Sequence, residues 1–325
     1  MATHRLTFSE AIVEALAEEM RRDANVFLIG QDIGPFGGSM RGAKGLWEEF
    51  GPARVMDAPI SESAMAGSGV GAALVGTRPV VELSFGEFLP TMMSCLVCHA
   101  ASMRYATGGE TSVPLVVRAR VGDGPYRGHP QSYEAWLTHI PGLKVVMPST
   151  PRDAKGLMKS AIRDDNPVIF FEQMYLYHGV HEEVPDGDYT IPIGVADVKR
   201  EGSDVTVVAT AWMVHKALRA AEQLAGEGIG VEVLDPRTLA PLDHATLLAS
   251  VEKTRRLVVV HEAWKVGGFG AEVASVVAEA LGMDLLGPIT RVGAKHLPIP
   301  AHQPLRRKVL PDVEDIVAAV RRVMA

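Results

Sequence analysis

Short apolar runs alternate with longer amphipathic stretches through the first half of the chain. Thr7 and Glu10 have capping-box spacing and open an amphipathic stretch that extends to about Arg22. The apolar runs are short enough to be buried strands, and the stretches between them have helical length. The predicted strands are Val26–Ile29, Arg54–Met56, Val80–Leu83, Leu115–Arg118, Leu143–Met147 and Val168–Phe171, and the main predicted helices are Ser61–Leu74, Glu87–Tyr105 and Asp153–Arg163. Strands that alternate with crossover helices predict a parallel sheet covered on both faces.

A second, smaller series of strands and helices follows a polar stretch, Gly179–Ile193, which predicts the connection between two domains. Its predicted strands are Val205–Ala209, Val231–Leu234, Leu257–His261 and Ile289–Val292, and its helices are about Met213–Ala225, Asp243–Val251, Gly268–Leu281 and Asp312–Met324. We therefore expect an α/β protein with two parallel-sheet domains, at residues 1–185 and 198–325, joined by a linker at 186–197. The length of 325 residues agrees with two domains of about 150 residues each.

Composition excludes several classes of function. The formal net charge of -7 argues against nucleic acid as a partner, because a phosphate-binding face needs clustered Lys and Arg. The longest apolar runs fall short of the ~20 residues that span a bilayer, so no membrane partner is expected. The chain opens on a polar segment without the pattern of a secretory signal. We expect it in the cytoplasm of a prokaryote, or in an organelle matrix if a transit peptide was removed.

The segment Cys95-Leu-Val-Cys98-His99 matches the pattern for covalent haem attachment and also contains a CxxC pair. Haem attachment requires export, and the chain opens without the pattern of a secretory signal. A structural zinc site needs four ligands, and the chain lacks a second cysteine pair to supply them. A redox pair normally begins a helix, whereas this pair falls inside a predicted one. The preferred interpretation is two buried cysteines that act as small apolar residues. An absorbance spectrum of the purified protein without a Soret band would exclude the interpretation as a haem protein.

Gly122-Asp123-Gly124 has the appearance of the start of the diphosphate- and metal-binding motif of thiamine enzymes. That motif requires an Asn about thirty residues further on and leads from a strand into a helix. The next Asn is Asn166, which is too distant, and the segment continues into Pro125 and Gly128. We interpret it as a loop.

Many segments resemble, in the same order, the β subunits of thiamine-diphosphate-dependent 2-oxo acid dehydrogenases. The segment Asp57-Ala-Pro-Ile-Ser-Glu62 is similar to the family's DTPISE/DTPLAE, and it is followed by Arg78-Pro-Val-Val-Glu82 and by Phe85 and Phe88 of an FxxF pattern. Further matches are Arg104-Tyr105, Gly108-Gly109, Pro141–Val146, Pro148–Gly156, Ala161–Asp164, Asn166-Pro167 and Gly267–Glu272. The resemblance covers about residues 4–324. It implies a transketolase-like pyrimidine-binding domain followed by a transketolase C-terminal domain.

In this family two α and two β subunits form a tetramer, and thiamine diphosphate lies between them. The resemblance implies that the α subunit holds the diphosphate and Mg²⁺, and that this chain holds the aminopyrimidine. It also implies that a lipoyl-bearing acyltransferase core receives the acyl product.

The resemblance assigns the central role to Glu62. It matches the carboxylate that hydrogen-bonds the 1′ nitrogen of the pyrimidine and exchanges the proton that activates the cofactor, a general acid–base role worth about 10²–10⁴ in rate. Without the resemblance, an acid in the first turn of a helix is explained by the helix dipole. Phe88 matches the aromatic that stacks on the pyrimidine, Phe85 is the fallback for that role, and Leu83 is expected to line the same pocket.

His129 lies in a Gly- and Pro-rich loop and matches the histidine of the family's HSQ segment, which is implicated in handling the intermediate and in reductive acylation of a lipoyl group. An imidazole suits proton delivery near neutral pH. Here the segment reads His129-Pro130-Gln131, and the preceding loop, Arg118–Gly128, is about two residues shorter. A proline at 130 predicts that His129 is held in an extended conformation.

A structural potassium ion is also implied in several relatives, bound mainly through backbone carbonyls. The matching positions are Leu115, Ala161, Ile162, Asp164 and Asn166.

The expected activity is decarboxylation of a 2-oxo acid, such as pyruvate or a branched-chain acid, followed by reductive acylation of a lipoyl domain. An acetoin-cleaving dehydrogenase and a split transketolase, which would transfer a two-carbon ketol unit, are the alternatives among enzymes. The substrate is not determined by this chain, because the acyl pocket is shared with the α subunit.

Overall fold

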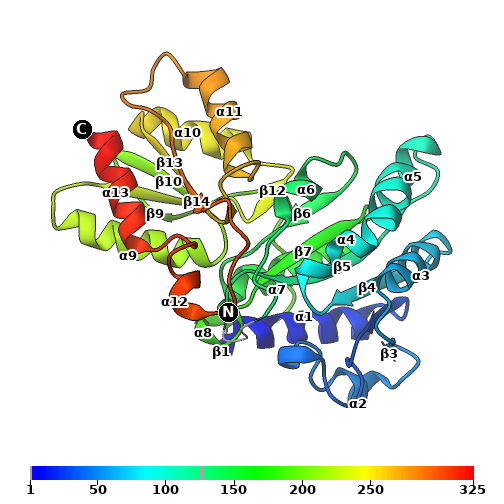
Figure 1. Cartoon of the computed structure of the whole chain (residues 1–325). Helices are drawn as coiled ribbons and strands as arrows, with labels where there is room; N and C mark the ends of the chain where they lie inside the picture. The colour runs from blue at the N-terminus through cyan, green and yellow to red at the C-terminus, as the bar shows by residue number, and fades with distance from the viewer. Residues whose placement is uncertain (1, 125–127) are drawn as a thin grey trace.

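The protein, in a computed structural model that describes residues 2–124 and 128–325, forms two groups of elements. The N-terminal group runs from blue to green in Figure 1 and occupies the lower right of the view. The C-terminal group runs from yellow-green to red at the upper left. Each group is built on its own sheet, so the predicted α/β class with two sheets is confirmed.

The N-terminal sheet has seven strands in the order β12-β6-β7-β5-β4-β2-β3. Its six strands from the first half of the chain pair in parallel. They are β2 (Val26–Gly30), β3 (Val55–Asp57), β4 (Arg78–Leu83), β5 (Val116–Val121), β6 (Lys144–Val146) and β7 (Val168–Gln173). All six were predicted from the apolar runs, and β5 and β7 are buried along their whole length, as expected for a sheet covered on both faces.

Helices α1 (Phe8–Arg22) and α7 (Pro151–Arg163) pack against each other. Thr7 and Glu10 form the predicted capping box of α1, and the Thr150 side chain caps α7 ahead of a first-turn proline. The other α-helices of this part are α2 (Leu46–Phe50), α3 (Glu62–Leu74), α4 (Leu89–Met93), α5 (Ala101–Ala106), α6 (Glu134–Thr138) and α8 (Leu176–Gly179).

The predicted helix Glu87–Tyr105 is broken into shorter pieces. A 3-10 turn, η2 (Gly86–Phe88), leads into α4, and a π-helical segment, η3 (Ser94–Ala100), joins α4 to α5. Only Leu96 and Ala100 are buried in η3, whereas Cys95 is half-buried and Cys98 is exposed. The prediction that both cysteines are buried is therefore wrong, because the inward face of this segment is occupied by Leu96 and Ala100, four positions apart.

No cluster of three or more His, Cys, Asp or Glu side chains suited to a metal ion occurs within residues 2–124 and 128–325. The two cysteines are free thiols. The structure therefore adds nothing in favour of a zinc site at Cys95 and Cys98.

The polar stretch predicted to connect the domains, Gly179–Ile193, is only partly a connection. Its residues His181–Pro185 form β8, which pairs antiparallel with β1 (Thr3–Thr7). This two-stranded ribbon is largely exposed, so its strands are polar and carry little of the apolar alternation that predicts a strand. No helix or strand spans 186–196, and the division of the chain by a linker at 186–197 stays a prediction.

The C-terminal sheet has the order β14-β13-β10-β11-β9. Its strands are β9 (Asp197–Arg200), β10 (Val205–Ala209), β11 (Val231–Asp235), β13 (Leu257–Trp264) and β14 (Thr290–Ala294), and its helices are α9 (Trp212–Ala225), α10 (His244–Thr254), α11 (Gly270–Leu281), α12 (Gln303–Arg306) and α13 (Val313–Met324). The edge strand β9 is antiparallel to β11, so the prediction of a wholly parallel sheet is wrong at this edge.

One strand from the C-terminal part crosses to the other sheet. β12 (Thr238–Ala240) pairs antiparallel with β6, and Arg237 beside it forms a salt bridge with Asp153 of α7 at 2.9 Å. The two groups of elements are therefore joined by backbone pairing as well as by side chains. Among the described residues, the helices are all too short or too polar to cross a membrane.

Candidate functional site

The carboxyl ends of β2 and β4 mark the point where the order of the N-terminal sheet reverses. From β2 the chain passes to β3 on one side and then to β4 on the other. In open α/β sheets, ligands bind outside the carboxyl ends of the strands at such a switch point. Gln31 follows β2, Ser84 and Phe85 follow β4, and Glu62 begins α3 after β3.

Glu62 is half-buried at the first position of α3, directly after the N-cap Ser61. The amide of Gln31 donates to Oε1 of Glu62 across 3.4 Å, and the hydroxyl of Ser84 donates to Oε1 of Gln31 across 3.4 Å. A carboxylate at a helix N-terminus is stabilised by the helix dipole. Glu62 is therefore oriented by side chains from both strands of the switch point and keeps part of its surface open to a ligand.

Phe85, Phe88 and His129 form an aromatic group beside the carboxyl end of β4. The ring centroid of His129 lies 4.8 Å from that of Phe85 and 4.8 Å from that of Phe88, while the two phenyl rings are edge-on at 6.4 Å. All three side chains are partly exposed. Leu83, at the end of β4, is only 1% exposed and packs in the core instead of facing the surface.

His129 has a backbone φ of +52°, so the prediction of an extended conformation before Pro130 is wrong. Its Nδ1 lies 3.2 Å from Oε2 of Glu87, and Gln131 donates to Oε1 of the same carboxylate at 3.1 Å. A non-glycine residue with positive φ is strained and persists only where its surroundings hold it. Contacts with the Glu87 carboxylate and the two phenyl rings stabilise this conformation and outweigh the preference of a residue before proline for an extended backbone.

A buried ionic cluster lies on the strands beneath the site. Arg118 of β5 donates to both oxygens of Glu172 at 2.6 and 3.1 Å and approaches Glu82 at 3.3 Å. Arg120 donates to Glu82 at 2.8 Å and, through Nε, to the carbonyl of Ser84 at 2.8 Å. Burial would lower the pKa of Arg118 and Arg120, but the charges of Glu172 and Glu82 outweigh it and raise the pKa of both. The contact with Ser84 links this cluster to the strand end beside Gln31.

Gly122-Asp123-Gly124 follows β5 and is a loop, as predicted for its described residues. Its residue Asp123 is bound by side chains that are distant in the chain. Gln173 donates to the Asp123 carbonyl at 2.7 Å, Glu262 accepts from its backbone N–H, and Arg306 pairs with its carboxylate. Burial raises the pKa of Glu262 to about 7. These contacts hold the loop against the C-terminal part of the protein.

Four residues described here were not predicted: Gln31, Ser84, Glu87 and Glu262. Glu87 lies between Phe85 and Phe88 in the chain, so an acid within the FxxF segment was an available signal. Gln31 lies two positions after the predicted strand Val26–Ile29, and polar residues at the carboxyl ends of parallel strands commonly line a site. For Glu262, no sequence signal connects it with Asp123, because 139 positions separate them.

The residues matched to a potassium site already have other partners. Arg78 donates to the carbonyls of Ile162 and Asp164 at 3.0 and 3.1 Å. The carbonyl of Leu115 accepts from Val168, and the carboxylate of Asp164 pairs with Lys144. A guanidinium on two of the carbonyls and an ammonium on the carboxylate do not fit an open cation cage, and we assign no function to potassium here.

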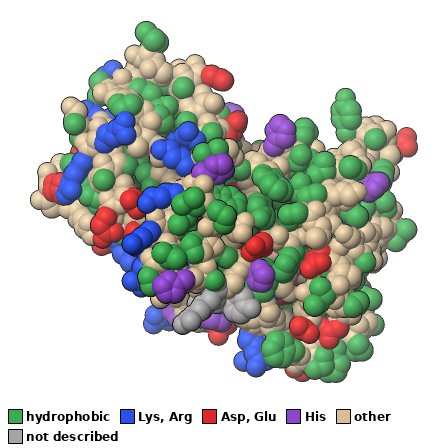
Figure 2. All heavy atoms as spheres, viewed as in Figure 1, with side chains coloured by type: hydrophobic (Ala, Val, Ile, Leu, Met, Phe, Trp, Pro, Cys, Tyr) green, Lys and Arg blue, Asp and Glu red, His purple; other side chains and the backbone are tan. Residues whose placement is uncertain are grey.

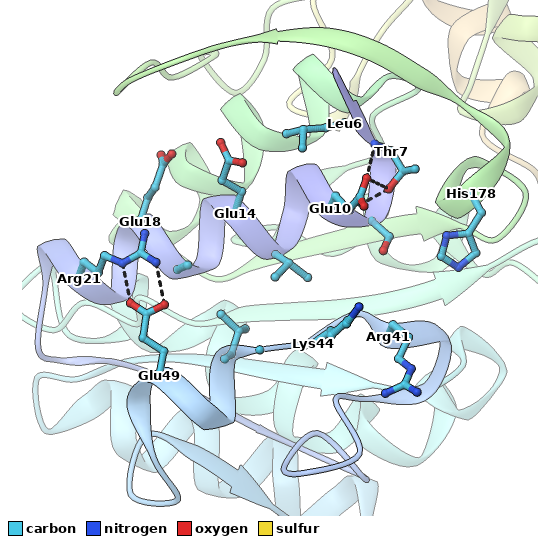
Figure 3. Close-up of a pocket in the computed structure, with 15 residues that line it drawn as sticks. Leu6, Thr7, Glu10, Glu14, Glu18, Arg21, Arg41, Lys44, Glu49 and His178 are labelled. Atoms are coloured by element: carbon cyan, nitrogen blue, oxygen red, sulfur yellow. Dashed lines mark hydrogen bonds and ion pairs between the residues drawn. The ribbon is translucent and has the colours of Figure 1, made fainter. Parts of the chain in front are cut away.

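A cavity of about 710 Å³ lies between α1 and the segment 41–49 (Figure 3). Glu10, Glu14 and Glu18 project from α1 on one side, and Arg41 and Lys44 lie on the other. Glu62, Phe85, Phe88 and His129 do not line it. The switch point, and not this cavity, therefore holds the residues selected from the sequence.

Comparison with protein families matches residues 4–178 to the transketolase pyrimidine-binding domain and residues 194–316 to the transketolase C-terminal domain. Among solved structures, a chain described as a split gene transketolase, inactive β4 tetramer, superposes with a TM-score of 0.80. It is 25% identical, and the match covers 98% of each chain. The predicted pair of domains is therefore confirmed.

Curated relatives match over almost the whole length. The 2-oxoisovalerate dehydrogenase subunit β of Bacillus subtilis is 44% identical over 98% of each chain. The pyruvate dehydrogenase E1 component subunit β of the same organism is 42% identical over 98% of this chain and 99% of the relative. Its acetoin:2,6-dichlorophenolindophenol oxidoreductase subunit β is 43% identical over 98% and 97%. The chain therefore belongs to the family of 2-oxo acid dehydrogenase E1 β subunits, built from the two transketolase domains.

Proposed function

We propose that this chain is the β subunit of a thiamine-diphosphate-dependent enzyme that decarboxylates a 2-oxo acid and passes the acyl group to a lipoyl domain. One observation carries the proposal: a half-buried carboxylate, Glu62, at the switch point of a parallel sheet, oriented by Gln31 and Ser84. The match to the transketolase pyrimidine-binding domain supports the choice of cofactor.

The residues around Glu62 fit an aminopyrimidine. Glu62 would hold a proton at the 1′ nitrogen of the ring and exchange it as the ring changes tautomer, the role of a general acid and base. Phe88 would stack on the ring, with Phe85 as its neighbour, because offset aromatic contacts add about 0.5–1.5 kcal/mol beyond burial. Thiamine diphosphate, when bound, supplies a nucleophilic carbon and an electron sink for decarboxylation.

His129 would act at the other side of the site, where the substrate and the lipoyl group meet. Its ring is held between Phe85 and Phe88, and its Nδ1 is directed at Glu87. An imidazole held in this way can deliver a proton through its other nitrogen. We assign it to the transfer of the acyl group, in agreement with the family's histidine.

The partner required by this proposal is an α subunit in an α2β2 tetramer. Gly122–Gly124 is a loop whose aspartate pairs with Arg306, so this carboxylate is engaged with a guanidinium and is poorly suited to hold a metal ion. The diphosphate and Mg²⁺ are therefore assigned to the α subunit. The acceptor is a lipoyl-bearing acyltransferase core, and the proposed location is the cytoplasm of a prokaryote.

The substrate is proposed as a class: pyruvate or a branched-chain 2-oxo acid. Relatives named for 2-oxoisovalerate, pyruvate and acetoin differ by only two percentage points in identity, from 42% to 44%, so acetoin cleavage is kept as an alternative. A split transketolase is the second alternative, because such a chain shares the fold at 25% identity. The higher identity to the dehydrogenase subunits favours the first proposal.

Reconstitution with an α subunit tests the proposal. The chain alone should lack decarboxylase activity, and the assembled enzyme should release CO₂ from a 2-oxo acid in the presence of thiamine diphosphate and Mg²⁺. Glu62→Gln should lower the turnover about 10²–10⁴-fold with assembly unchanged by size-exclusion chromatography. Near-normal turnover of Glu62→Gln, or robust activity of the chain alone, contradicts the proposal. Transfer of a ketol unit instead of an acyl group would identify the split transketolase.

A further inference from the structure

A second surface, far from Glu62 in the chain, has the chemistry of a binding site. A groove of about 520 Å³ runs along β14, between the face of α13 that carries Asp315, Ala318, Ala319 and Arg322 and the segment Arg307–Pro311. Its floor is apolar at Val292, Val309 and Leu310. Ala318 and Ala319 are small, so the helix leaves room beside the strand.

Six cationic side chains and a single carboxylate, that of Asp315, line this groove. The cations are Lys265, Arg291, Lys295, Arg307, Lys308 and Arg322. Arg291 is half-buried and donates to the carbonyl of Lys265 at 3.0 Å, and the other five are exposed. Within the part of the chain that the structure describes, none of the six forms an ion pair within 4.0 Å. Figure 2 shows Lys and Arg side chains gathered on the C-terminal half of the face in view.

This concentration of unpaired positive charge stands out against the rest of the molecule. The chain carries a formal net charge of -7, and neighbouring surface cations have acidic partners. Arg321, one position from Arg322, pairs with Glu227 at 2.6 Å, and Lys216 pairs with Asp312 at 3.2 Å. The groove is therefore a local positive field on an acidic protein, which favours an anionic ligand.

The strand in the groove is an open edge. β14 is the first strand of its sheet and pairs with β13 alone. Among the described residues, residues 290–293 make no backbone hydrogen bond on the outer side, whereas Lys295, at the end of the groove, donates to the carbonyl of Val309 at 3.0 Å. Free N–H and C=O groups along a strand form a template that an extended chain can pair with.

We propose that this groove binds an extended acidic segment of a partner polypeptide, which adds as a strand to the outer edge of β14 and sets its carboxylates against the six cations. Pairing with a partner strand would use the open edge of β14, and the six cations would select a partner segment that is acidic. The open edge favours a polypeptide over a nucleic acid, because only a polypeptide backbone supplies the regularly spaced N–H and C=O groups that pair with the outer edge of β14. The proposal does not depend on the function assigned to Glu62.

Protection of the edge is the competing explanation, because charged side chains on an edge strand also prevent aggregation. The two explanations differ in what charge reversal does. A binding groove loses affinity for an acidic segment, whereas a protected edge loses solubility without a change in affinity.

The test uses the full chain and a fluorescent twelve-residue peptide in which Glu alternates with Val and Thr. Fluorescence anisotropy should show binding that weakens with salt, as expected for partly exposed charges. The double variant Arg291→Glu with Lys295→Glu should weaken binding at least tenfold. The matched control, Arg5→Glu with Lys44→Glu, makes the same change in net charge at exposed positions of the N-terminal part and should bind as the parent does.

Two further probes separate the parts of the proposal. The same peptide N-methylated at alternate residues keeps its charge but loses backbone donors, and its affinity should fall at least tenfold. Equal binding of the methylated peptide, equal loss in the control variant, or tighter binding of a single-stranded oligonucleotide would overturn the proposal. So would aggregation of the groove variant with its affinity unchanged, or loss of peptide binding when the α subunit is assembled.

Discussion

Glu87 holds both His129 and Gln131, with Oε2 at 3.2 Å from His129 Nδ1 and Oε1 at 3.1 Å from the amide of Gln131. Glu87→Ala should therefore release the loop that carries His129 and Gln131 from η2. Two hydrogen bonds contribute about 1–3 kcal/mol together, which corresponds to a loss of about 5–150-fold in acylation of a lipoyl domain. Decarboxylation measured with an artificial acceptor should fall much less.

The comparison for this variant is Glu110→Ala, which removes an exposed acid outside the site and should leave both assays unchanged. His129→Ala should reproduce the pattern of Glu87→Ala. If both variants lose the two activities equally, His129 acts in the earlier step instead of in acyl transfer.

Phe88 and Phe85 have different assigned roles, and their truncations should differ. Phe88→Ala removes the proposed stacking partner and should raise the apparent KM for thiamine diphosphate about tenfold, which corresponds to about 1.4 kcal/mol. Phe85→Ala should act mainly on lipoyl acylation, because its ring contacts His129 at 4.8 Å. Steady-state titration of the cofactor in the assembled enzyme checks this, and a KM effect confined to Phe85→Ala would exchange the two roles.

Arg118 is buried between Glu172 and Glu82, and its removal leaves the buried carboxylate of Glu172 without a cation, whereas Glu82 keeps its pair with Arg120. Arg118→Met should lower the free energy of unfolding by about 3–5 kcal/mol, measured by urea denaturation. The matched variant Arg21→Met breaks a pair with Glu49 whose side chains are 57% and 39% exposed. Arg21→Met should lower the free energy of unfolding by about 0–1 kcal/mol. Equal losses for the two variants would show that the buried cluster stabilises the fold no more than an exposed ion pair does.

Glu262 should make stability depend on pH. Burial raises the pKa of Glu262 to about 7 in the folded chain, above its ordinary value. The folded state then holds a proton that the unfolded state has lost, so this contribution to stability is complete below about pH 4.5 and is lost as pH rises through about 7. At about 1.4 kcal/mol per pKa unit, the loss amounts to about 3.5 kcal/mol.

The measurement is the free energy of unfolding at pH 5, 6, 7 and 8 for the parent chain and for Glu262→Gln, which cannot titrate. The difference between the two should change in favour of the variant as pH rises. Parallel profiles would contradict a raised pKa for Glu262.

The sequence by itself determined the elements and their kind. The apolar runs identified the six parallel strands from the first half of the chain, because strands buried on both faces are mostly apolar. Thr7, Glu10 and Thr150 marked helix starts because their side chains cap their own helices. The motifs around Glu62 and Arg78 identified the family. All of these signals are local: each depends on residues that are close together in the chain, either as an apolar run, as a helix cap or as a short motif.

Only the tertiary structure decided which distant residues meet. The strand β8 was hidden because its exposed, polar residues lack apolar alternation and depend on β1 for pairing. The crossing of β12 to the other sheet, and the contact of Glu262 with Asp123, depend on how the two sheets pack. His129 is the clearest case: its local sequence favours an extended backbone, whereas Glu87, Phe85 and Phe88 hold it at φ +52°. A local preference for one backbone conformation, worth about 1–3 kcal/mol, is overcome where several tertiary contacts act on the same residue.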